Sequence, residues 1–190
     1  VLQAWWPGDE GGNAIADVLF GDYNPGGKLP YTMYASDEQV PSTDEYDISK
    51  GFTYMYLKKK PLFAFGYGLS YSKFHYSDLQ ISSPVVSVND TVSVALKVKN
   101  MGNRAGEEVV QLYVRDVKAK VVRPTKELRG FKRIALQPNE EQEIRLMLPV
   151  KSLAFYDESI GNFFVEPGKF EILLGSASDD IRLQSKLIVN

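Results

Sequence analysis

The sequence predicts a mostly β protein, in which an antiparallel β-sandwich follows a short β-α-β fragment. Two observations predict the sandwich. Beyond residue 74, several segments place apolar side chains at every second position, which is the period of a half-buried strand. Turn-forming Gly, Pro and Asn residues separate these segments. About seven short strands with such punctuation are typical of a β-sandwich.

Four segments show the alternation most clearly. Their inward residues are expected to be Val92, Val94, Leu96 and Val98; Val110, Leu112 and Val114; Ile144, Leu146 and Leu148; and Phe170, Ile172 and Leu174. In the second segment, Gln111, Tyr113 and Arg115 are expected to point outward. Each fully buried aliphatic side chain contributes about 1.5–3 kcal/mol, so residues 74–190 are expected to fold as a unit.

Residues 1–35 have a different pattern, typical of a strand, a helix and a second strand. Val1–Trp6 is a short apolar run, residues 13–20 have apolar positions at helical spacing, and Lys28–Met33 is expected to be the second strand. Gly21 suits the left-handed position that follows a helix. Such a fragment cannot enclose a core by itself, so we expect it to pack against another polypeptide or to be poorly ordered.

Residues 36–73 connect these two parts. Their first half is polar and loop-like, and long loops in compact proteins usually carry function or wrap another domain. The ring-rich stretch from Leu62 to Tyr76 follows, and Gly66 and Gly68 within it permit tight turns. We interpret this stretch as a rigid, aromatic junction.

Several motifs resemble glycoside hydrolase family 3, the family of β-glucosidases and β-xylosidases. They are the segments QAWWPGDEGGNAIADVLFGDYNPGGKLP (3–30), KGFTYMY (50–56), LFAFGYGLSYSKFHY (62–76), EEVVQLYV (107–114) and PTKELRGFK (124–132). They occur in the family's order over nearly the whole chain. The last two resemble the fibronectin type III-like domain of that family.

The resemblance implies that this is the C-terminal region of such an enzyme. Residues 1–35 would end its α/β sandwich domain, residues 36–73 would form a crossing loop and aromatic junction, and residues 74–190 would be the fibronectin type III-like domain. The family hydrolyses terminal β-linked sugars with retention, using an aspartate nucleophile and a glutamate acid/base that both lie upstream of the segment matching Trp6–Pro30. This chain is therefore expected to hold no catalytic residue and no cofactor, and to stabilise the catalytic domains.

The same resemblance indicates the partners: the upstream catalytic domains and the oligosaccharide substrate of the complete enzyme, which serves plant polysaccharide breakdown. The resemblance does not decide whether the enzyme prefers glucose or xylose. It also leaves a homodimer as one possible oligomeric state. A periplasmic or secreted location is expected, with the cytoplasm as the alternative.

Four residues are candidates for contact with the sugar. Trp5 and Trp6 have rings suited to stacking on a sugar face, although alternation along a strand would turn at least one into the core. Asp44 and Tyr46 lie in the polar loop, whose acids are otherwise interpreted as solvated. The adjacent Asp9 and Glu10 are interpreted as charges at a helix start rather than as the paired carboxyl groups that glycoside hydrolysis needs.

Composition excludes several other functions. The chain has one histidine, His75, and no cysteine, which leaves no His-based triad, multi-histidine metal site or disulfide. A net charge of −2 gives no general case for nucleic acid or anionic membranes, and no apolar run is long enough for a membrane span. The basic stretch 118–133 offers only Phe131 for stacking, so we interpret it as a basic surface facing solvent or the catalytic domains.

A second hypothesis is a carbohydrate- or partner-binding module without catalysis. It requires an exposed aromatic platform on the sandwich. The outward strand positions offer Tyr113 alone, which argues against this alternative.

Overall fold

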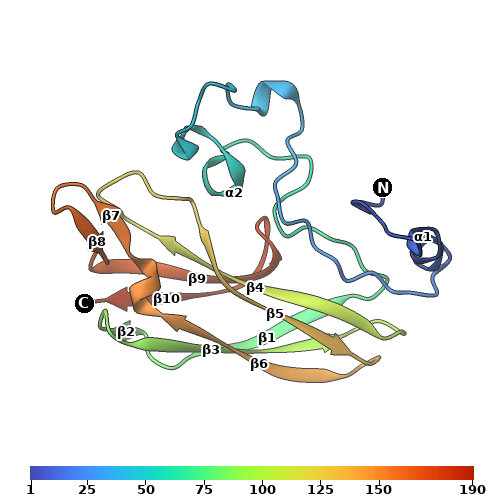
Figure 1. The fold of residues 1–190 in the computed structure, drawn as a ribbon. Helices are drawn as coiled ribbons and strands as arrows, with labels where there is room; N and C mark the ends of the chain where they lie inside the picture. Colours follow the sequence, from blue (N-terminus) through green and yellow to red (C-terminus); the bar gives the residue numbers. More distant parts are fainter.

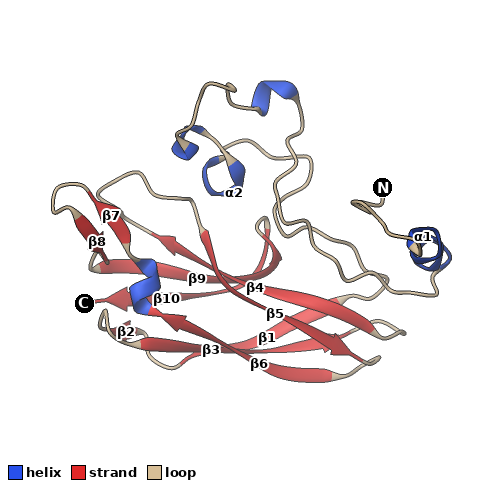
Figure 2. Cartoon of the chain, in the orientation of Figure 1, coloured by secondary structure: helices blue, strands red, loops and turns tan.

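The computed structural model describes residues 1–190 as two stacked β-sheets, with an N-terminal segment that lies across them (Figure 1). Most helical turns lie in that N-terminal segment (Figure 2). The helical elements are α1 (Gly11–Phe20), η1 (Asp37–Gln39), η2 (Ile48–Lys50), α2 (Thr53–Tyr56) and η3 (Val150–Leu153). The strands are β1 (Phe74–Ile81), β2 (Val85–Val86), β3 (Thr91–Asn100), β4 (Gly106–Asp116), β5 (Glu127–Leu136), β6 (Glu141–Pro149), β7 (Phe155–Asp157), β8 (Asn162–Phe164), β9 (Gly168–Ala177) and β10 (Asp180–Val189).

The two sheets form the predicted sandwich. One has three strands in the order β1-β3-β6, and the other has five in the order β2-β10-β9-β4-β5. All neighbours are antiparallel except the short β2, which runs parallel to β10. Seven strands have eight or more residues, in agreement with the expected number, and β7 and β8 add a small hairpin at one end.

The core lies between the sheets and consists of 22 buried residues. It contains every residue predicted from the alternation in the four segments of β3, β4, β6 and β9. The antiparallel register explains this agreement, since Val94 lies opposite Leu146 and Leu112 lies opposite Leu174. Directly opposed apolar side chains on one face are the unit that stabilises a sheet.

Two strand residues expected to point outward are buried instead. Gln111 is 3% exposed and Tyr113 is 0% exposed, whereas Arg115 is exposed as predicted. Both lie on the outer face of β4, the face away from Leu112, where Gly66 covers Gln111 and the Tyr54 ring covers Tyr113. The prediction was wrong because the alternation of one strand contains no information about a later segment that packs on its outer face.

The two strands expected on either side of the first helix are absent. Residues 1–6 have no regular structure, and 28–33 contribute only one isolated bridge, between Met33 and Phe63. Strands of a parallel α/β sheet need parallel neighbours for their hydrogen bonds, whereas residues 28–33 bond to the junction, for example from Leu29 N to Tyr67 O at 2.9 Å and from Gly66 N to Leu29 O at 2.7 Å. The helix itself is confirmed as α1, and Gly21 ends it with a left-handed φ of 88°.

The first six residues also differ from the sequence-based expectation in their burial. Trp5 is 55% exposed and Trp6 is 92% exposed, so neither lies in a core. Trp5 has a positive φ of 52°, which breaks the alternation assumed for a strand. On α1, Leu19 and Phe20 are exposed as well. Packing of this region on another polypeptide therefore remains a prediction.

Residues 34–61 form a loop that leaves the sandwich and returns to it. Backbone bonds between Met33 and the Leu62–Phe63 pair close the base of the loop, with 2.9 Å from Met33 N to Phe63 O. The Gln39 side chain ties the two arms together by accepting from Ala35 N and donating to Lys60 O. None of the helices is both long and apolar enough to cross a membrane.

Candidate functional site

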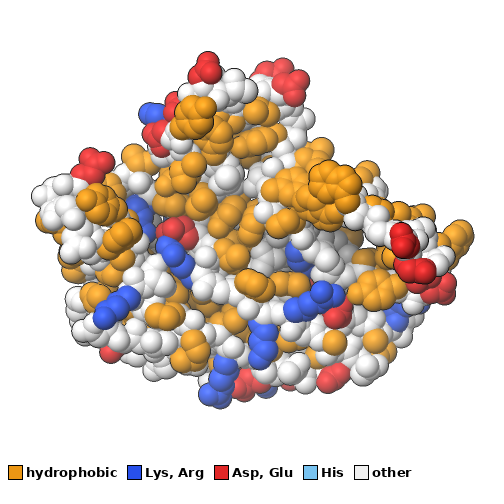
Figure 3. All heavy atoms as spheres, in the orientation of Figure 1, with side chains coloured by type: hydrophobic (Ala, Val, Ile, Leu, Met, Phe, Trp, Pro, Cys, Tyr) orange, Lys and Arg blue, Asp and Glu red, His pale blue; other side chains and the backbone are white.

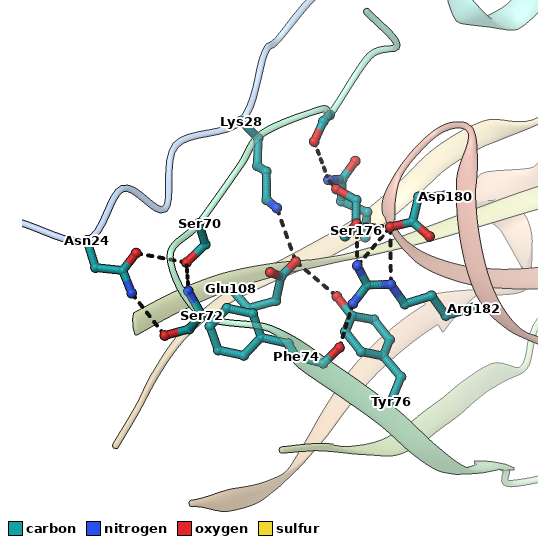
Figure 4. A network of polar contacts seen from close by, with 12 residues as sticks. Asn24, Lys28, Ser70, Ser72, Phe74, Tyr76, Glu108, Ser176, Asp180 and Arg182 are labelled. Carbon is teal, nitrogen blue, oxygen red and sulfur yellow. Dashed lines mark hydrogen bonds and ion pairs between the residues drawn. The ribbon is translucent and has the colours of Figure 1, made fainter. Parts of the chain in front are cut away.

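The candidate site is the junction at which residues 24–72 are joined to the edge of the sandwich. We call it the polar seam, and Figure 4 shows that it connects the N-terminal segment with β1, β4 and β10. Its members are Asn24, Lys28, Ser70, Ser72, Phe74, Tyr76, Glu108, Gln111, Ser176, Asp180 and Arg182.

A buried ion pair lies at the centre of the polar seam. Lys28 Nζ is 3.2 Å from Glu108 Oε1, and the Glu108 side chain is only 3% exposed. The Tyr76 hydroxyl donates to the same oxygen over 3.1 Å. Burial raises the pKa of Tyr76, and the adjacent Glu108 carboxylate adds to this effect, so the hydroxyl keeps its proton. One oxygen of the Glu108 carboxylate thus contacts both Lys28 and Tyr76 and ties residue 28 to the sandwich.

Arg182 on β10 links both sheets. Its guanidinium donates to Asp180 Oδ2 at 2.8 Å, to Ser176 Oγ at 3.0 Å and to Phe74 O at 2.9 Å (Figure 4). It also lies 4.7 Å from the centre of the Tyr76 ring. The hydrogen bond from Arg182 holds the pKa of Asp180 below its ordinary value, with a further contribution from the Ser176 hydroxyl.

Asn24 fixes the turn that follows α1. Its Nδ2 donates to Ser72 Oγ at 3.1 Å and to Ala105 O at 2.8 Å. Its Oδ1 accepts from Ser70 Oγ at 2.9 Å and from Tyr71 N at 2.8 Å. This amide therefore makes all four of the hydrogen bonds that an Asn side chain can make, which explains why the turn is held at this point.

Gln111 joins the aromatic junction to the five-stranded sheet. Its Nε2 donates to Gly66 O at 3.2 Å and to Ser176 O at 2.5 Å, and its Oε1 accepts from the Tyr113 hydroxyl. Gly66 has a φ of 81°, and a Cβ there would overlap the Gln111 amide. Tyr54 completes the cluster, because its ring stacks on Phe65 with centroids 4.5 Å apart.

A groove of about 420 Å³ runs between the turn at residues 22–24 and the sandwich. Several of its polar groups are engaged: Glu107 accepts from Tyr23 Oη at 3.1 Å and pairs with Arg133, and Arg104 donates to Gly21 O at 2.7 Å. The hydrogen bond from Arg133 holds the pKa of Glu107 below its ordinary value. These contacts make the groove part of the junction, and the exposed Asp22 is the one carboxylate of its lining without a hydrogen bond or ion pair.

The four predicted sugar-contact residues do not meet in one pocket. Trp5 makes an edge contact with Tyr31, with centroids 5.6 Å apart, and Trp6 makes no aromatic contact. Tyr46 is 89% exposed and Asp44 is also exposed, and both lie in the loop formed by residues 34–61. The role of these four residues in sugar binding remains a prediction.

No cluster of three or more His, Cys, Asp or Glu residues is positioned to hold a metal ion.

The residues that build the seam were not recognised from the sequence. One signal was present: the run from Val109 to Val114 is almost continuously apolar, which is typical of a strand covered on both faces. Lys28, Glu108 and Arg182 carry no such signal, because each is an isolated charge whose partner is remote in sequence. The basic stretch was also only partly interpreted correctly, since Arg123 is largely buried against Phe155 and bonded to Glu127.

Two family models match this chain. Residues 1–71 match the glycosyl hydrolase family 3 C-terminal domain, and residues 108–178 match the fibronectin type III-like domain. Thermostable β-glucosidase B of Acetivibrio thermocellus is 44% identical over 100% of this chain and 27% of its own length. Xylan 1,4-β-xylosidase of Xylanibacter ruminicola is 42% identical over 99% of this chain and 21% of its own.

Solved structures agree with these similarities. The β-glucosidase 3B of Thermotoga neapolitana superposes with a TM-score of 0.87 at 35% identity, covering 98% of this chain and 28% of that one. The chain thus spans about a quarter of the length of the relatives it matches.

The fold and the seam define a fibronectin type III-like sandwich joined to an N-terminal segment that carries helix α1 and a long loop. Together with the two domain matches, they show that the chain belongs to glycoside hydrolase family 3 and corresponds to the C-terminal region of its members.

Proposed function

We propose that residues 1–190 are the C-terminal, non-catalytic part of a retaining, exo-acting β-glycosidase that hydrolyses terminal β-linked glucose or xylose. The observation that carries the proposal is the match along the whole chain to β-glucosidases and a β-xylosidase. The engaged state of the seam carboxylates supports a structural role. Glu107, Glu108 and Asp180 each pair with a cation, so none is free to serve as an acid or a nucleophile.

The polar seam supplies the physical basis for that role. Buried charges are costly unless paired, so Lys28 and Glu108 favour one docking position of residues 1–35 on the sandwich. Residues 1–35 then end the α/β domain, 36–73 form the crossing loop and junction, and 74–190 form the sandwich that supports them. We call residues 1–35 the arm; its exposed apolar side chains, such as Trp6 and Phe20, would face the upstream catalytic domains in this arrangement. Figure 3 shows hydrophobic side chains exposed over the N-terminal segment.

We further propose that the loop carrying Asp44 and Tyr46 lines the sugar cleft of the complete enzyme. Both side chains are free of long-range contacts and available to a ligand. The complete protein is proposed to act in the periplasm or outside the cell, since a relative with 39% identity is named a periplasmic β-glucosidase, from Salmonella typhimurium.

Hydrolysis of aryl β-glucosides and aryl β-xylosides by the complete protein and by the 190-residue chain tests the function. The complete protein is expected to turn over one or both substrates, and the isolated chain neither. Turnover by the isolated chain would refute the non-catalytic role.

A second experiment tests the supporting role. A complete protein lacking residues 74–190 should melt at a lower temperature, and an unchanged melting temperature would refute that role.

The alternative, a binding module, has one observation in its favour. Tyr156 and Phe163 are exposed on the β7–β8 hairpin, with ring centroids 5.6 Å apart. Their planes lie at 76°, so they do not form the flat platform that a sugar chain stacks on. Retention of the chain on insoluble xylan or cellulose, lost in Tyr156→Ala, would favour this alternative.

A further inference from the structure

The tip of the crossing loop, residues 40–47, has no hydrogen bond or ion pair to the sandwich. Its bonds are local, for example 3.0 Å from Glu45 N to Ser42 O and 2.9 Å from Ser49 N to Asp47 Oδ1. The position of the tip therefore depends on how the loop is attached on either side.

One attachment is the base of the loop at Met33 and Phe63, and the other is the short helix α2. Helix α2 contacts the start of β5 and the residues just before it: Thr125 N donates to the main-chain Met55 O at 2.8 Å, and Leu128 N donates to the side-chain hydroxyl of Tyr54 at 3.0 Å. The Tyr54 ring lies between Phe65 and Tyr113, stacked on the first at 4.5 Å and edge-on to the second at 5.8 Å.

The backbone of α2 is held in a conformation that it would not adopt freely. Thr53, the first residue of α2, has a φ of 56°, which is a strained value for a β-branched residue. Tyr34 Oη accepts from Thr53 N at 3.2 Å and helps to hold this geometry. Such strain persists only where surrounding contacts impose it, so the contacts around Tyr54 must outweigh it.

We propose that Tyr54 is the positioning residue of a latch by which the start of β5 fixes the loop tip that carries Asp44 and Tyr46. The fibronectin type III-like sandwich thereby determines the position of a loop as well as supporting the fold. The statement about sugar rests on the function proposed above, whereas the latch itself rests on the contacts of Tyr54.

Distances between two spin labels test the latch directly. The chain has no cysteine, so Thr43→Cys in the tip and Lys132→Cys on β5, both exposed, provide two unique sites. We expect a narrow distance distribution in the otherwise unchanged 190-residue chain. Tyr54→Ala should broaden it, because the ring contacts and the acceptor for Leu128 N are lost together. An unchanged distribution in Tyr54→Ala would overturn the latch.

Matched variants keep the result interpretable. Tyr156→Ala removes an equally aromatic side chain from the β7–β8 hairpin and should leave the distribution narrow. Tyr54→Phe keeps the ring and removes only the hydroxyl, so amide exchange at Leu128 should rise, by roughly threefold to tenfold for one lost hydrogen bond. Unchanged exchange at Leu128 in Tyr54→Phe would also count against the latch.

Kinetics of the complete protein separate the latch from the sugar-binding role. If the tip lines the cleft, Tyr54→Ala should raise KM for an aryl β-glycoside and change kcat much less. A broadened distance distribution with unchanged KM would leave the latch standing and refute the proposed role of Asp44 and Tyr46. A raised KM with a narrow distribution would refute the latch.

Discussion

The side-chain amide of Gln111 lies directly against the backbone of Gly66. Gln111 Nε2 donates to Gly66 O at 3.2 Å, and the glycine has no side chain that would displace it. Because Gly66 also has a φ of 81°, both the conformation and the close approach require glycine here. The ring-rich junction is thus fixed to β4 at Gly66, a residue without a Cβ.

Gly66→Ala is expected to lower the free energy of unfolding by about 2–5 kcal/mol. The left-handed conformation costs about 1–2 kcal/mol, and disturbing the buried Gln111 hydrogen bonds costs about 1–3 kcal/mol. Gly161→Ala is the matched control, because Gly161 has a φ of 63° but nothing within 4 Å of an added Cβ. Urea denaturation of both variants gives the comparison, and equal losses would show that the contact with Gln111 contributes nothing.

Lys28→Met should destabilise the chain by about 3–5 kcal/mol, because it leaves the buried Glu108 carboxylate without its cation. Glu108→Gln in the same molecule removes that unpaired charge and should recover part of the loss. Arg145→Met is the control, since Arg145 and Glu143 form an exposed pair at 2.9 Å and such pairs contribute little. Urea denaturation measures the free energy of unfolding of each variant. A double variant whose loss of this free energy equals the sum of the losses in the two single variants would contradict this account.

The sandwich could be predicted because its information is local. Residues such as Val94 and Leu146 alternate within their own strands, and their faces follow from the period of two alone. Helix α1 could be predicted for the same reason, with Gly21 as its end signal.

The seam could not be predicted from such patterns, because its members meet only in the folded chain. Lys28 and Glu108 are 80 residues apart, and Arg182 reaches Phe74 across 108 positions. Tyr113 was predicted to point outward and is buried instead, for a related reason. Its cover, Tyr54, comes from a loop whose course over the sheet has no periodic signature.

Stability should depend on pH through Asp180. Its pKa is lowered in the folded state, mainly by the hydrogen bond from Arg182, so the folded chain binds its proton less readily than the unfolded chain does. The stabilisation from the carboxylate is therefore complete above the unfolded pKa of about 4 and is lost as the pH falls through the lower folded value. Melting temperatures of the wild type and Asp180→Asn should differ at neutral pH and converge once the pH has fallen through the lower folded value.

The control for this measurement is Asp22→Asn. Asp22 is exposed and its carboxylate makes no hydrogen bond or ion pair, so the difference from the wild type should stay nearly constant across the same range. If the melting temperatures of the wild type and Asp180→Asn differ by the same amount at low and neutral pH, the Asp180 carboxylate is not the source of the pH dependence.

Limited digestion with chymotrypsin should remove the first part of the arm from the 190-residue chain and spare the sandwich. Trp6 and Phe20 are 92% and 84% exposed, and the side-chain hydrogen bonds that tie the residues before Asn24 to the junction and the sandwich are confined to Val18, Gly21 and Tyr23. Phe131 is an internal control, since it is 65% exposed but lies within the long strand β5, whose backbone is hydrogen-bonded. Exposure alone does not permit cleavage, because the protease needs a locally unfolded segment.

In the complete protein the same arm should resist cleavage, because the upstream domains would cover its apolar side chains. An arm that resists digestion in a monomeric 190-residue chain would contradict this prediction.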